Sequence, residues 1–141
     1  MRLKLNLQYP PTPENAARHA QLAVDAARNV DGITLDFSPK TLKEVDRIIG
    51  SFHAEGLRSA QVGETVFSFG CYVGEIFVRH HAGRWIMPKR SLFGFGGSDM
   101  MLVEMPGGTV CNPIGRAFKL LERGVSESFA YFYQVMVPQG A

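Results

Sequence analysis

The sequence predicts an α+β fold, in which about five helices surround one buried helix over residues 63–81 and pack on a small antiparallel sheet. Three observations support this prediction. Residues 66–78 are apolar on nearly every side of a helix, which is typical of a helix inside a core. Helical patterns come first and strand patterns cluster later, which favours α+β over a parallel βαβ sheet. The length of 141 residues suits a single globular domain, residues 1–141.

The first half of the chain reads as strand, helix, strand and helix. Leucines alternate with polar residues over 1–7, which is the period of a half-buried strand. Alanines at helical spacing predict a helix over 13–29, and a short strand is expected over 33–37. Ser38, followed by a proline, then predicts the N-cap of a second helix, and Gly56 suits its C-terminal end.

The predicted central helix contains two glycines four residues apart, Gly70 and Gly74. Because glycine has no side chain, this face leaves room for another backbone to approach. The alanine face of the helix over 13–29 is a candidate for that neighbour.

The second half changes period after Gly83. Short strands are expected over 84–87, 100–105 and 109–111, joined by glycine-containing turns. Asn112, followed by a proline, predicts the start of a helix that ends near residue 123. A last helix is expected after a cap at Ser126.

Composition excludes several classes of protein. A formal net charge of +2, with 45% hydrophobic and 20% charged residues, excludes a disordered chain and argues against a nucleic-acid binder. The N-terminus lacks a signal-peptide pattern, and the longest apolar-rich run, 66–78, is shorter than the roughly 20 residues that a membrane span needs. Cys71 and Cys111 form no CxxC pair, so we expect a cytoplasmic protein with reduced thiols and no cofactor or metal.

Glu75 is the first candidate site residue, because it is the only charged residue between Glu64 and Arg79 on a helix that should be buried. A buried carboxylate needs a partner. One interpretation is structural, either an ion pair with Arg79, four residues along, or a bond to the backbone end of a neighbouring element. The other is an acid, a base or a ligand anchor in a pocket, with Tyr72 and His80 on adjacent turns.

The second candidate is a basic stretch, residues 79–90, which holds four of the fifteen basic residues and no acid. It suits either a solvated helix end or contact with a phosphate, an acidic partner protein or nucleic acid. His80 and His81 are adjacent and therefore point to different faces, which makes them a poor metal pair. The glycine-rich loop that follows is either a linker, a partner contact or a phosphate cradle. The candidates for partner binding are Arg84, Trp85, Lys89, Arg90, Phe93 and Phe95.

Trp85 is the best aromatic anchor for such a contact, and it suits the core equally well. Cys111 stands just before a predicted helix start, where a thiol can become reactive. No base or local signature accompanies it, so a small buried residue is the simpler interpretation. His19 and His53 are expected on helix surfaces.

Three short motifs carry a resemblance: Tyr72-x-Gly74-Glu75, then Gly83-Arg84-Trp85, then Asn112-Pro113. In this order, over residues 33–123, the chain resembles small uncharacterised bacterial α+β domains, some of which occur in toxin-immunity and secretion-chaperone settings. The resemblance implies protein binding and supplies no catalytic residue.

Taken together, the sequence favours a non-enzymatic, bacterial-type protein-binding module that binds a partner protein or itself as a homodimer. The alternative is a small-molecule-binding protein or enzyme with a pocket around Glu75. No membrane contact is expected.

Overall fold

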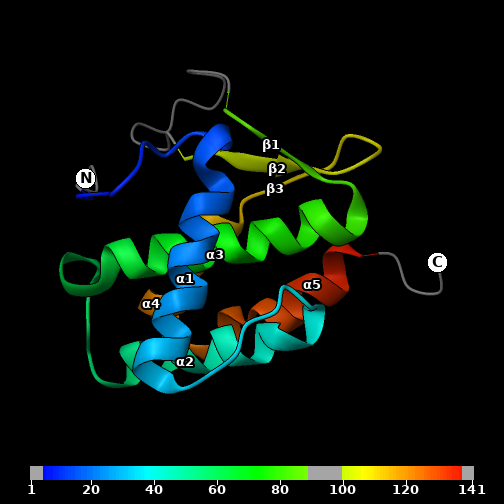
Figure 1. The fold of residues 1–141 in the computed structure, drawn as a ribbon. Coiled ribbons are helices and arrows are strands. Elements are labelled where there is room, and N and C mark those ends of the chain that lie inside the picture. The colour runs from blue at the N-terminus through cyan, green and yellow to red at the C-terminus, as the bar shows by residue number, and fades with distance from the viewer. Residues whose placement is uncertain (1–4, 89–99, 138–141) are drawn as a thin grey trace.

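A computed structural model describes residues 5–88 and 100–137 and confirms the α+β prediction (Figure 1). The described helices and strands are α1 (Ala16–Asp31), α2 (Leu42–Ala54), α3 (Ser59–His81), β1 (Arg84–Ile86), β2 (Leu102–Glu104), β3 (Val110–Cys111), α4 (Pro113–Arg123) and α5 (Phe129–Met136). Three short 3-10 helices accompany them: η1 (Pro13–Asn15), η2 (Pro39–Thr41) and η3 (Val125–Glu127).

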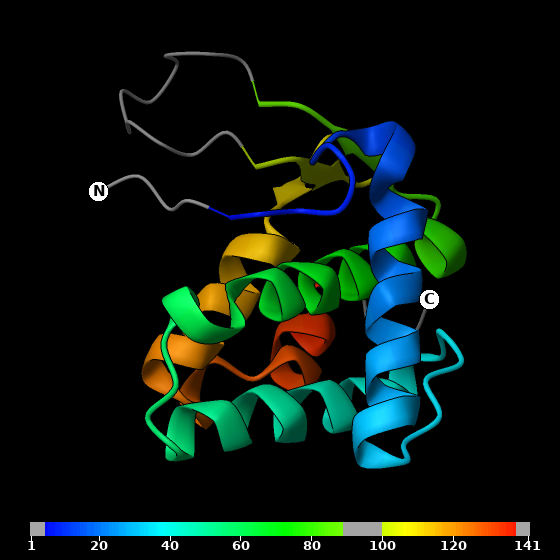
Figure 2. The same cartoon turned by 60° about the vertical axis from the view of Figure 1, so that its left-hand side comes forward.

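Helix α3 lies at the centre of the described structure. The sheet lies above it in Figure 1, α1 crosses it, and α2, α4 and α5 lie below (Figures 1 and 2). Thirteen of its residues are buried, among them Phe67, Tyr72 and Phe77. The sequence prediction of a central buried helix is therefore confirmed, with a start at Ser59 rather than residue 63. The earlier start is stabilised because the side-chain oxygen of Gln61 accepts the Arg58 N–H at 2.7 Å.

The three strands form an antiparallel sheet in the order β1-β2-β3. Trp85 pairs with Val103, and Val103 pairs with Cys111, so these three side chains share one face. Val103 is completely buried, which identifies this face as the inner one, towards α3 and α4. Arg84 and Glu104 lie opposite each other on the outward face and form an ion pair at 2.9 Å.

The two glycines of α3 do allow close packing, but against partners that differ from the prediction. A Cβ at Gly70 would lie 2.6 Å from the backbone of Ile114 on α4. A Cβ at Gly74 would lie 2.1 Å from the Trp85 ring on β1. The alanine face of α1 also packs on α3. It does so on a side of α3 other than the one that carries these two glycines. Because α3 is apolar all round, periodicity could not assign its faces to particular neighbours.

Both strands predicted in the first half are absent from the described residues. Residues 33–37 are irregular and end at Phe37, whose φ of +64° turns the chain away from an extended path. Residues 5–7, the described part of the segment over 1–7, pair with no strand. Ser38 does not cap a helix with its side chain: its hydroxyl donates to Asp36, and η2 precedes α2.

In the second half of the chain, one helix start is set by a residue next to it and the other by a residue on a different helix. Asn112 caps α4 as predicted, because its side-chain oxygen accepts the Gly115 N–H at 2.9 Å. The cap of α5 is Ser128 rather than Ser126. The reason is Asp46 on α2, whose carboxylate accepts the backbone N–H of Phe129 at 2.6 Å and the hydroxyl of Ser128 at 3.0 Å.

Gly70→Ala tests the close approach of α3 and α4. The added methyl group must displace the Ile114 backbone, so we expect a loss of roughly 1–3 kcal/mol in the free energy of unfolding. Urea denaturation followed by circular dichroism measures it. Gly50→Ala is the matched control, because a Cβ there meets its nearest neighbour at 3.8 Å and alanine favours a helix. If both variants were as stable as the wild type, the close approach would be contradicted.

Candidate functional site

Two of the candidate residues on α3, Tyr72 and His80, hold the same residue of the chain, Phe37. The Tyr72 hydroxyl accepts the Phe37 N–H at 2.9 Å and is hydrogen-bonded to the Thr41 hydroxyl at 2.6 Å. Nε2 of His80 donates to the Phe37 carbonyl at 2.7 Å. Both backbone polar groups of Phe37 are therefore bound by side chains of α3.

The Phe37 side chain is held in the same way. Its ring lies 4.7 Å from the Tyr72 ring, and the Arg79 guanidinium lies 3.6 Å from its centroid on a cation–π contact. A left-handed backbone at a bulky residue costs about 1–3 kcal/mol, and such residues persist only where their surroundings determine them. The polar groups of Tyr72 and His80 therefore bind the backbone of the strained turn at Phe37.

Glu75 has partners for both carboxylate oxygens. Oε1 accepts from Nε of Arg79 at 3.1 Å, and Oε2 accepts from Nε1 of Trp85 at 2.9 Å, while the residue is 7% exposed. The predicted pair with Arg79 is confirmed. Sequence reasoning missed the Trp85 bond, because Trp85 comes from a strand that turns back over the helix. Glu75 therefore joins β1 to α3.

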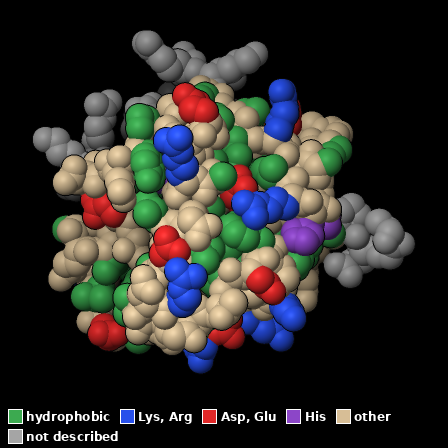
Figure 3. Space-filling view, in the orientation of Figure 1, with side chains coloured by type: hydrophobic (Ala, Val, Ile, Leu, Met, Phe, Trp, Pro, Cys, Tyr) green, Lys and Arg blue, Asp and Glu red, His purple; other side chains and the backbone are tan. Residues whose placement is uncertain are grey.

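The candidate partner-binding residues divide into three groups. Trp85 is half-buried over Gly74, so much of its ring already packs within the fold. Arg84 is exposed on the outward face of the sheet. Lys89, Arg90, Phe93 and Phe95 lie outside the described residues. On the face shown in Figure 3, basic and acidic side chains are interspersed rather than gathered by sign.

The two thiols are buried, and burial works against their reactivity. Desolvation, reinforced by the charge of Glu75, raises the pKa of the Cys71 thiol well above its usual value. Burial raises the pKa of Cys111 to about 11. A nucleophilic cysteine needs the opposite shift, so the environment of Cys111 favours the interpretation as a small buried residue.

Within the described ranges 5–88 and 100–137, no three His, Cys, Asp or Glu side chains lie close enough together to bind a metal ion. None of the helices in these ranges is both long enough and apolar enough to span a membrane.

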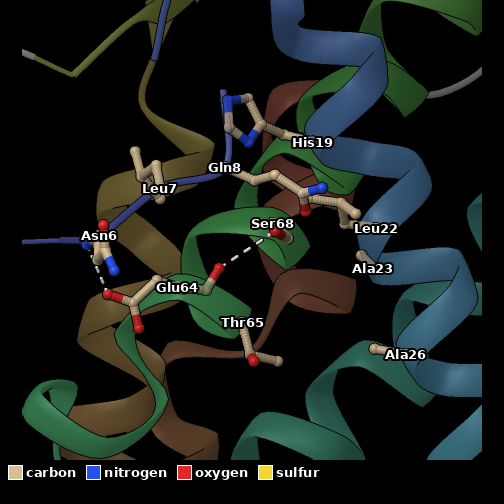
Figure 4. A pocket seen from close by; sticks show the side chains of 10 residues that line it. All are labelled: Asn6, Leu7, Gln8, His19, Leu22, Ala23, Ala26, Glu64, Thr65 and Ser68. Atoms are coloured by element: carbon tan, nitrogen blue, oxygen red, sulfur yellow. Dashed lines mark hydrogen bonds between the residues drawn. The ribbon is translucent and has the colours of Figure 1, made fainter. Parts of the chain in front are cut away.

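A pocket of about 210 Å³ lies between residues 6–8, the first half of α1 and the start of α3 (Figure 4). None of the predicted site residues that the structure describes lines it. The polar side chains on its wall include His19, Glu64 and Ser68. Oε2 of Glu64 accepts the Asn6 N–H at 2.8 Å, which fixes the N-terminal segment along the pocket rim.

His19 lies in the core rather than on the helix surface as predicted, and it is completely buried. Its ring contacts Tyr9 and Phe67 edge to face, and its Nε2 bonds the Pro10 carbonyl at 3.2 Å. Its Nδ1 has no hydrogen-bond partner in the part of the chain that the structure describes, and a buried polar atom without a partner costs about 1–3 kcal/mol. The prediction failed because residues 5–10 fold back over α1, which helical spacing alone does not reveal.

No family model, curated protein or solved structure matches this chain. The resemblance to immunity and secretion-chaperone domains therefore stays a prediction.

Glu75→Ala tests the link between β1 and α3. It removes the acceptor of the N–H of the half-buried Trp85, so we expect a loss of about 1–3 kcal/mol in the free energy of unfolding. Trp85 is the single tryptophan, so its fluorescence reports both the unfolding and the local change. The control is Glu44→Ala, which removes another carboxylate paired with an arginine within one helix, on the surface. Equal stability of the two variants would show that the Trp85 bond adds nothing.

The raised thiol pKa values predict a loss of stability in alkali. The Cys111 pKa rises from 9.0 to about 11, so the unfolded chain loses this proton before the folded one. The stabilisation is complete below about pH 9 and disappears as pH rises towards 11, by roughly 2–3 kcal/mol. Denaturation curves at several pH values measure it, with Cys111→Ala as the control that should lose the share of the decline due to Cys111 and keep the share due to Cys71. An identical decline in the variant would refute the assignment.

Proposed function

We propose that this chain is a non-enzymatic protein-binding module that associates with a second copy of itself through the outward face of its sheet. The observation that carries the proposal is the composition of that face. Ile86 and Leu102 lie opposite each other there and are half-buried, and Val110 is 45% exposed. Apolar side chains in such a position favour contact with another protein.

The charges on the same face make it complementary to itself. Arg84, with a side chain 75% exposed, lies beside Glu104 in the row next to the apolar pair. In a two-fold contact the same patch meets its own copy, so each residue needs a partner of opposite character in the patch. Arg84 of one protomer can then bind the partner's Glu104, and the reciprocal pair forms with it.

The hydrogen bonds of the polar residues on α3 support the non-enzymatic part of this proposal. Tyr72, Glu75 and His80 have their polar atoms engaged with Phe37, Arg79 and Trp85, which leaves little for a substrate to bind. Both cysteines are free and buried, in keeping with the reducing compartment that a cytoplasmic location would provide.

The strands are two or three residues long, so the face that they form is small. Because small interfaces bind weakly, we expect an association that depends on concentration. Light scattering coupled to size exclusion, over a series of protein concentrations, measures the mass. The mass should rise towards twice 15.6 kDa in the wild type. Val110→Asp should remain a monomer, because it places a charge within the apolar contact.

Val30→Asp is the matched control, since Val30 is also an exposed valine, at 80%, but lies on α1 away from the sheet. It should associate as the wild type does. A wild type that stays monomeric at every concentration would overturn the proposal, as would equal effects of the two aspartates.

A further inference from the structure

We propose that the pocket between residues 6–8, α1 and α3 binds a short primary amine whose other end carries an N–H or O–H donor. The inference does not depend on self-association, because the pocket shares no residue with the outward face of the sheet. It depends on a buried acceptor that no residue within 5–88 and 100–137 engages.

The acceptor is Nδ1 of His19. The Pro10 carbonyl can only accept a hydrogen bond, so the Nε2 that contacts it carries the proton. In the neutral ring the lone pair is then on Nδ1, which has no partner among the described residues although His19 is completely buried. In Figure 4 the ring of His19 stands over the pocket, and one ring nitrogen points down towards the space between Gln8 and Ser68. A ligand that binds there must donate.

The other polar groups of the pocket select a cation. Glu64 places a carboxylate in the wall, and no Lys or Arg is among the described residues that line the pocket. The Ser68 hydroxyl donates to the Glu64 carbonyl at 3.1 Å, so its oxygen offers only lone pairs to a ligand. Asn6, Gln8 and Thr65 also line the pocket, and their side chains can accept as well as donate. Acceptors together with the single carboxylate of Glu64 suit an ammonium group.

The remaining wall and the volume suit a short alkyl chain. Leu22, Ala23 and Ala26 line the α1 side with aliphatic groups. The volume of about 210 Å³ is smaller than the roughly 300–1,000 Å³ of typical drug-sized sites. A ligand of this size has room for an ammonium at Glu64, a few methylene groups, and a terminal donor at His19.

The test is a titration of the full-length chain with 4-amino-1-butanol, followed by NMR of ¹⁵N-labelled histidine rings. The Nδ1 signal of His19 should move upfield to saturation as it gains a donor. His53, His80 and His81 lie outside the pocket and serve as internal controls. 1,4-Butanediol, which has the same length without the ammonium, should bind about tenfold more weakly.

Glu64→Gln should reduce the affinity for the amine by about tenfold, because it removes the charge and keeps the shape. Glu55→Gln, at the exposed end of α2, removes an equal charge elsewhere and should change nothing. An unmoved His19 signal would overturn the proposal. Equal binding of the diol and the amine, or equal affinities of the two glutamine variants, would also overturn it.

Discussion

The burial of residues 66–77 of α3 on every side is the constraint on which the rest of the structure depends. A helical stretch that is apolar on nearly every side, as residues 66–77 are, can be stable in water only if other elements cover it all round. Helices α1 and α4 and the sheet supply most of this cover, and α2 and α5 add to it, for example where Phe132 and Tyr133 of α5 contact the Phe77 ring. Gly70 and Gly74 let two of these neighbours approach closely enough to exclude water. The short sheet owes its position to this helix.

The few polar groups on α3 give that packing its specific geometry. Apolar contact is non-directional, whereas a buried polar group requires a partner at a defined place. Glu75 fixes the position of β1 through Trp85, and Tyr72 and His80 fix the turn at Phe37. Each of these residues holds a segment without regular secondary structure, or a strand too short to be stable by itself. The residues that the sequence marked as a possible site therefore determine the fold.

Local signals predicted local structure well. The helix start predicted at Asn112 is correct, because the capping bond joins Asn112 to Gly115, only three residues along the chain. The apolar run of α3 and the pair of Glu75 with Arg79 also follow from spacing along one helix. The failures involve partners far apart in the chain. The strand expected at 33–37 is replaced by a turn that Tyr72 holds, the cap of α5 is supplied by Asp46, and His19 is covered by residues near Pro10.

Native-state hydrogen exchange tests the central claim, the dependence of the whole fold on α3, most directly. If every neighbour depends on this helix, the amides of residues 66–77 can open only when the entire chain unfolds. Their opening free energies should then equal the global free energy of unfolding measured in denaturant, whereas those of the short, peripheral α5 should be lower. Amides of 66–77 that exchange at a lower free energy than another element would contradict this account.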